Sequence, residues 1–225
     1  MITHLEHDLK ELKSSLIKMA SMAERAIERA IESLITNNKA LAEQVISEDT
    51  NINDMEIVID KAIVDLLALQ QPVASDLRLI LAVAKINNNL ERIGDHAVNL
   101  AQSALFLLKM KEPLPSLQEI QSMTEVTKRM LSDALDSFIH VDAKMSEAVL
   151  MMDDAADNLN KKIMQEMKVI MKSNPQTIEQ ALELIRVSRN LERVSDLATN
   201  IAEEVMFIAQ AKVVKHHAAD ISHNK

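Results

Sequence analysis

Cysteine is absent from this chain of 225 residues, and glycine occurs only once. Without cysteine there is no disulfide, no thiolate zinc site and no iron–sulfur cluster, so a metal has to use oxygen or imidazole ligands. One glycine and four prolines disfavour tight hairpins, glycine-rich phosphate loops and the Rossmann turn, which need backbone that glycine adopts most easily. Sheet architectures and P-loop nucleotide binding are therefore not expected.

Aromatic residues and net positive charge are also missing. The chain has three phenylalanines, no tyrosine and no tryptophan, and its formal net charge is -9. Proteins that bind single-stranded nucleic acids stack bases on aromatic rings, and a negative protein is repelled by phosphate backbones. We therefore expect no nucleic-acid partner.

The chain has no long hydrophobic run. The longest apolar run of note covers residues 97–108 and includes Asn99, Gln102 and Ser103, so it is too short and too polar to span a bilayer. The first residues lack the continuous apolar stretch of a signal peptide. These features predict a cytoplasmic protein.

Helical periodicity extends over nearly the whole chain. Apolar residues recur at alternating spacings of three and four, beginning with Leu5, Leu9, Leu12 and Leu16, which is typical of helices with one buried face. Asparagine and proline breaks predict six helices, over residues 5–34, 41–70, 74–110, 116–139, 143–172 and 175–213. The fold class is thus all-α, and the prolines at 113 and 115 divide it into two tandem three-helix bundles. We predict bundles over residues 1–112 and 116–215, followed by a frayed tail over 216–225.

An internal repeat supports this division. Residues 89–101 and 190–202, which are 101 positions apart, are identical at eight of thirteen positions. The second helices of the two halves align with an offset of 104 instead, which predicts three fewer residues in the link to the third helix of the second half.

Polar residues repeat as well as apolar ones, which a buried stripe alone does not explain. Each third helix carries a glutamate, an aspartate and an asparagine spaced i, i+4, i+8, at Glu91, Asp95 and Asn99 and at Glu192, Asp196 and Asn200. Two carboxylates one turn apart repel each other when both are ionised. A bound cation would remove that repulsion.

The second helices can complete these rows. An antiparallel second helix would bring Asp49 to the first row, and Asp153 with Asp157 to the second. Such oxygen-rich clusters suit Mg²⁺, Mn²⁺, Ca²⁺ or iron. The first half has Asn53 where the second has Asp157, so we expect its cluster to be weaker by one charge.

The acidic rows also have an interpretation without a metal. Arg92 could pair with Asp95, and Arg193 with Asp196, each three residues later, to form ordinary solvated salt bridges. Three residues after Glu91 and Glu192 stand Gly94 and Ser195 rather than histidine. The Glu-x-x-His pairs of di-iron bundles are therefore absent, and redox chemistry is not expected. Gly94 itself indicates either close helix packing or space left beside the acidic row.

The doubled Glu-Arg-x-x-Asp pattern resembles the PhoU family of bacterial phosphate-signalling proteins. It lies at Glu91-Arg92 with Asp95 and at Glu192-Arg193 with Asp196, and the resemblance includes the Asp76-Leu77-Arg78 opening of the third helix. The family fold is two similar three-helix bundles. Some members carry iron or zinc clusters on these rows and others bind magnesium or manganese, so the identity of any metal here is not implied.

The resemblance implies a function without catalysis. It implies a negative regulator of the phosphate-starvation response that couples a Pst-type phosphate ABC transporter to a PhoR-type sensor histidine kinase and modulates phosphate uptake. Membrane attachment would be peripheral, at the inner face and through those partners. Long amphipathic helices with an apolar edge also favour a homodimer. Two alternatives are an accessory protein of another phosphate permease and, less favoured, a carboxylate-bridged metalloenzyme.

Overall fold

The computed structural model describes residues 4–110 and 118–211, and this part of the chain is helical without strands. The elements are α1 (His4–Ile35), α2 (Lys39–Gln70), α3 (Ala74–Leu107), α4 (Gln118–His140), α5 (Ala143–Met151), α6 (Asp153–Ser173), η1 (Pro175–Thr177) and α7 (Ile178–Gln210). The predicted fold class, all-α with two tandem three-helix bundles, is confirmed. The predicted boundary between residues 112 and 116 and the predicted tail 216–225 lie outside the described residues.

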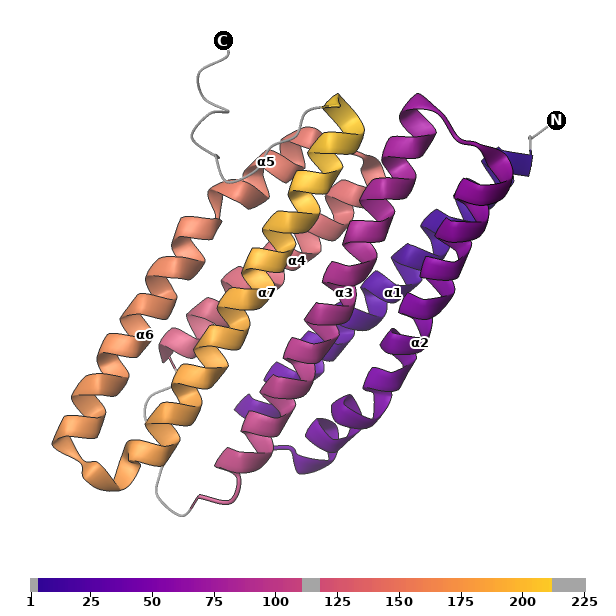
Figure 1. Ribbon diagram of the computed structural model, residues 1–225. Coiled ribbons are helices and arrows are strands. Elements are labelled where there is room, and N and C mark those ends of the chain that lie inside the picture. Colours follow the sequence, from indigo (N-terminus) through magenta and orange to yellow (C-terminus); the bar gives the residue numbers. More distant parts are fainter. Residues whose placement is uncertain (1–3, 111–117, 212–225) are drawn as a thin grey trace, which may run out of the picture.

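The two bundles pack side by side. Figure 1 shows α6, α7, α3 and α2 in one layer, with α4 and α1 behind it. Between the bundles, α3 packs against α7 and α1 against α4. Lys85 of α3 pairs with Glu204 of α7 at 2.8 Å, whereas His96 lies 2.8 Å from Asn190. The later residue of α3 thus contacts the earlier residue of α7, so the two helices are antiparallel.

The turn between the first two helices is the same in both halves. Asn37 and Val141 have left-handed backbone, with φ of 54° and 53°, and the next residue donates its N–H to a serine carbonyl of the preceding helix at 3.0 and 2.9 Å. This is the hydrogen bond of a Schellman turn. The following helix is capped by the side chain of Asn38 in one half and Asp142 in the other. The offset of 104 therefore extends back through this turn.

The fifth predicted helix is not continuous. Residues 143–172 form α5 and α6, separated at Met152, whose N–H donates to the Val149 carbonyl three residues back. The bond tightens the last turn of α5 in the manner of a 3₁₀ helix. Asp153 and Asp154, poor helix formers that are favourable in a first turn, then begin α6. The prediction of one uninterrupted helix was wrong at this point.

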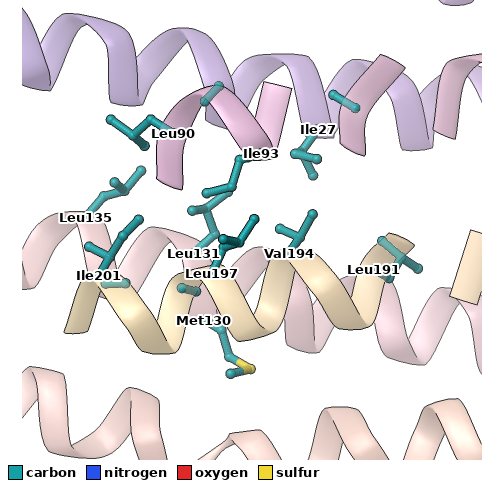
Figure 2. Packing of buried hydrophobic residues seen from close by; sticks show 14 of the residues in the cluster. Ile27, Leu90, Ile93, Met130, Leu131, Leu135, Leu191, Val194, Leu197 and Ile201 are labelled. Atoms are coloured by element: carbon teal, nitrogen blue, oxygen red, sulfur yellow. The ribbon is translucent and has the colours of Figure 1, made fainter. Parts of the chain in front are cut away.

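One hydrophobic core runs through both bundles. The buried residues of α1, α3, α4 and α7 belong to a single cluster. Figure 2 shows side chains of α1 and α3, including Ile27 and Ile93, facing those of α4 and α7, including Leu131 and Leu197. Each of the helices α3 and α7 therefore packs against its own bundle with one face and against the other bundle with another face.

We expect the cost of truncating an isoleucine to depend on which helix face carries it. Ile93→Ala removes a side chain that is 0% exposed and should lower the free energy of unfolding by about 3 kcal/mol. The matched control Ile57→Ala, at a side chain that is 65% exposed, should change it by less than about 0.5 kcal/mol. Urea unfolding of both variants measures the difference, and equal costs would contradict the packing described here.

Candidate functional site

Four carboxylates gather between α2 and α3, and we call them the first acidic cluster: Asp49, Glu56, Glu91 and Asp95. Burial raises the pKa of Glu91, and the charges of Asp95, Glu56 and Asp49 raise it further, against a smaller lowering by Arg92. Burial also raises the pKa of Glu56, with added contributions from Asp60 and Asp95. The four side chains are thus close enough to repel one another.

Asp49 occupies the most enclosed place in this cluster. Burial raises its pKa, a hydrogen bond from Asn53 lowers it, and the charge of Asp95 raises it. Asn53 Nδ2 donates to Asp49 Oδ2 at 3.1 Å. The other oxygen of each side chain, Oδ1 in both cases, is buried without a hydrogen-bond partner. Two buried oxygens that lack a donor fit a site for a cation.

Gly94 allows α2 to approach the row on α3. A Cβ atom at this position would lie 3.1 Å from Cδ1 of Ile52 and 3.2 Å from Oδ1 of Asp49. Both distances are shorter than ordinary carbon contacts. The close-packing interpretation of this glycine is therefore supported. One of the two atoms closest to this Cβ position is the unpaired oxygen of Asp49.

The second acidic cluster lies at the equivalent place between α6 and α7 and comprises Asp153, Asp157, Glu192 and Asp196. Burial raises the pKa of Asp153, followed by the charges of Asp196, Asp157 and Asp154. Burial and Glu192 raise the pKa of Asp196, Arg193 lowers it, Asp157 raises it and His96 lowers it. The structure thus brings the carboxylates of both predicted rows near the second-helix aspartates expected to face them.

The sequence analysis missed Glu56. It follows Asp49 by seven residues on the same face of α2, and its counterpart at the offset of 104 is Asn160, which accepts a hydrogen bond from Ser188 at 2.6 Å. Glu56 therefore supplies the carboxylate that Asn53 does not, and both clusters contain four. The expectation that the first cluster is weaker by one charge compared only positions that match between the halves, and it stays a prediction.

Asn99 and Asn200 face elsewhere. Asn99 Oδ1 accepts a hydrogen bond from Arg186 Nη2 at 3.2 Å, and Asn200 lines a hollow of about 490 Å³ with Lys85 and Asn88. Both asparagines therefore lie on the seam between α3 and α7. Eight residues of an α-helix turn the side chain about 80° from the starting direction, which carries these positions away from α2 and α6. Their role as metal ligands stays a prediction.

The arginine interpretation applies to one cluster only. Arg193 lies 3.7 Å from Glu192 and 3.9 Å from Asp196, with its own side chain 61% exposed. Within residues 4–110 and 118–211, Arg92 forms no ion pair with Asp95. Because Arg92 forms no such pair, the like-charge repulsion in the first cluster is largely uncompensated. The pairs of Arg193 in the second cluster are exposed and long, and such pairs contribute little to stability.

The carboxylates do not yet converge on one point. In the described ranges, no three histidine, aspartate or glutamate side chains are placed so that they could hold one ion. Asp95 is exposed, whereas Glu91 and Asp49 are half-buried. Metal binding at both clusters therefore stays a prediction.

Over residues 4–110 and 118–211, no helix is long and apolar enough to cross a membrane.

Comparison with known proteins gives matches over most of the chain. The model of the PhoU domain matches twice, at residues 16–104 and 120–205. The phosphate-specific transport system accessory protein PhoU homolog of Aquifex aeolicus is 37% identical over 93% of this chain and 94% of its own length. The phosphate-specific transport system accessory protein PhoU of Escherichia coli is 30% identical over 95% of this chain and 88% of its own.

Solved structures agree. The crystal structure of PhoU from Pseudomonas aeruginosa superposes with a TM-score of 0.90 at 34% identity and covers 93% of this chain and 100% of its own. That of the phosphate transport system regulatory protein PhoU from Streptococcus pneumoniae gives 0.87 at 25% identity, covering 94% of this chain and 100% of its own.

Raised pKa values in the clusters predict how stability depends on pH. Glu91 ionises at its ordinary value of 4.5 in the unfolded chain but at a higher pH in the folded one. As pH rises through this window the unfolded state loses its proton first, so the free energy of unfolding falls. Glu91→Gln should remove part of this fall and stabilise the protein at pH 7 by up to about 1 kcal/mol, after allowance for solvent screening.

Thermal unfolding of both proteins between pH 4 and 7, a range set by ordinary carboxyl pKa values of about 4, measures this effect. Glu32→Gln, at an exposed position outside both clusters, is the control and should leave the profile unchanged. A Glu91→Gln variant that is less stable than the wild type at neutral pH in metal-free buffer would contradict the repulsion described above.

Proposed function

Because the chain belongs to the PhoU family, we propose that it is an accessory protein of a phosphate transport system and a negative regulator of the phosphate-starvation response. The observation that carries the proposal is the double match of the family domain to both halves of the chain. Relatives from distant bacteria that cover nearly the whole chain have names that refer to phosphate transport.

In the finer form of the proposal, the chain couples a phosphate ABC transporter to a sensor histidine kinase. When phosphate is plentiful, it keeps the kinase from activating its response regulator. The protein acts by contact rather than catalysis, stays at the inner face of the membrane through the transporter, and forms a homodimer. Equivalent apolar pairs at the starts of α3 and α7 support a role in protein contact, since all four side chains are exposed: Leu77, Leu81, Ile178 and Leu182.

Metal is the second part of the proposal. Asp49, Glu91 and Asp95, with Glu56, would hold a hard divalent cation or iron in the first cluster, and their counterparts would do so in the second. The unpaired buried oxygens of Asp49 and Asn53 support this assignment. A bound cation would neutralise the repulsion and draw α2 toward α3 and α6 toward α7. The surfaces offered to the transporter and the kinase would then depend on metal.

The regulatory role is tested by deleting the gene and growing the bacterium in abundant phosphate. A phosphate-starvation reporter such as alkaline phosphatase should be expressed at a high level in the deletion strain and at a low level in the wild type. Restoring the gene should restore repression. Unchanged reporter expression would contradict the coupling to the kinase and would favour an accessory role for a different phosphate permease.

Metal binding predicts a specific stabilisation of the purified protein. At Mn²⁺ concentrations about 100 times the dissociation constant, the melting temperature should rise by about 5–10 °C for each occupied cluster. The double variant Glu91→Gln/Asp95→Asn should lose half of the bound metal measured by elemental analysis, because the second cluster remains. Glu32→Gln again serves as the control. If the double variant keeps the full metal content, the first cluster is not a metal site.

A further inference from the structure

A groove between α1 and α2 is open in the first half of the chain. Two hollows of about 550 and 320 Å³ lie along it, and Val58 lines both. The groove ends where α1 and α2 are joined, by Arg29 to Glu48 at 2.8 Å and by Gln70 to Asp8 at 3.3 Å. Twenty-two residues of α2 separate these two contacts, a distance of about 33 Å at 1.5 Å per residue.

The lining of this groove is apolar at its base. The residues that both helices contribute include Met22, Ala26, Ile52, Met55, Ala62 and Leu66. Val58 is 57% exposed between the two hollows, and Leu69 is 77% exposed at the far end. A hydrophobic surface of this length that remains open to solvent is typical of a site for another apolar surface.

In the second half of the chain, larger side chains occupy the positions that correspond to residues lining the groove. At the offset of 104, Ala26 corresponds to Met130, which is 0% exposed and packs in the core. Val58 corresponds to Lys162 and Ser15 to Glu119, and these two side chains form a salt bridge of 2.7 Å across α4 and α6. The side chains at these positions therefore differ between the halves, in addition to the break between α5 and α6.

Charge differs between the two walls along the larger hollow. On α1, Lys18 and Arg25 line this hollow and are exposed, and neither forms an ion pair within the described residues, whereas Asp8 and Glu11 of α1 line the smaller hollow. On α2, Asp54 and Asp65 are exposed along the opposite wall. Between the two end contacts, no ion pair joins α1 to α2 in the part of the chain that the structure describes. Both walls therefore have charge available for a partner.

We propose that this groove binds an amphipathic α-helix of a partner protein, with acidic residues against Lys18 and Arg25 of α1 and a basic edge against Asp54 and Asp65 of α2. Helices that bind in grooves use an apolar face of this kind, and about 20 residues of helix would fill the length between the two end contacts. Opposite charges at the two edges fix the orientation of the bound helix. The inference rests on the proposed function in one respect, which is that the chain acts by binding other proteins.

The groove is tested in cells by closing it as the second half is closed. The variant Ser15→Glu/Ala26→Met/Val58→Lys introduces the counterparts of Glu119, Met130 and Lys162. It is placed in a deletion strain in which the wild-type gene restores repression, so that the proposed function has already been tested. The closed variant should fail to repress the reporter although it is folded by circular dichroism and expressed at wild-type level. Full repression by the closed variant would overturn the inference alone.

A matched control separates closure from surface change. Val169→Lys/Ser173→Glu adds the same pair of charges on α6, where both residues are exposed. This control should repress the reporter as the wild type does. Equal loss of repression in the control and in the closed variant would overturn the assignment to the groove.

The chemistry of the partner is tested with a designed probe. A 20-residue helical peptide with a leucine face, glutamates on one edge and lysines on the other is titrated by fluorescence anisotropy against the full chain. Wild type should bind it saturably, and Lys18→Glu/Arg25→Glu should weaken binding by about tenfold. The control Lys168→Glu/Lys172→Glu, which makes the same charge change on exposed positions of α6, should bind as the wild type does.

The remaining outcomes count against the proposal. Saturable binding that survives in both the closed variant and Lys18→Glu/Arg25→Glu would place the peptide outside the groove. No binding by the wild type would overturn a helical partner of this charge pattern. A doubling of mass in light scattering that the closed variant abolishes would identify the occupant as a second copy of this chain instead.

Discussion

The packing of α3 against α7 is the constraint on which the rest of the structure depends. These two helices are buried on the side of their own bundle and on the side of the other one, so their apolar residues leave little freedom in how they rotate. The antiparallel arrangement places the two acidic rows on opposite flanks of the same seam. Each row can then meet only the helix beside it, α2 in one half and α6 in the other.

The acidic clusters are held together by the fold and oppose its stability. Carboxylates that are partly removed from water and close to one another raise each other's pKa, which means that the ionised form is penalised. Apolar burial along α3 and α7 offsets this penalty. Six of the eight carboxylates stand at positions that match between the two halves, and clustered groups with perturbed pKa values are typical of sites that bind a ligand or a partner.

Much of this arrangement could be predicted from the sequence, because apolar periodicity and an internal repeat are strong signals. The repeat and an antiparallel second helix predict Asp49 beside the first row and Asp153 beside the second, and the structure has both aspartates there. Glu56 was missed for the same reason, since its counterpart is Asn160 and a comparison of identities passes over it. The break at Met152 involves a local change in backbone hydrogen bonding that apolar periodicity does not reveal. The direction of Asn99 depends on helix rotation, which residue spacing describes only approximately.

The continuous core has a consequence for how the chain folds. The two halves repeat one sequence pattern, yet buried side chains of α1 and α3 pack against those of α4 and α7 in a single cluster. Neither half alone can cover the surface that the other half covers. The unit expected to gain or lose structure cooperatively is therefore the whole pair of bundles, and one half separated from the other would expose part of its most buried helix to water.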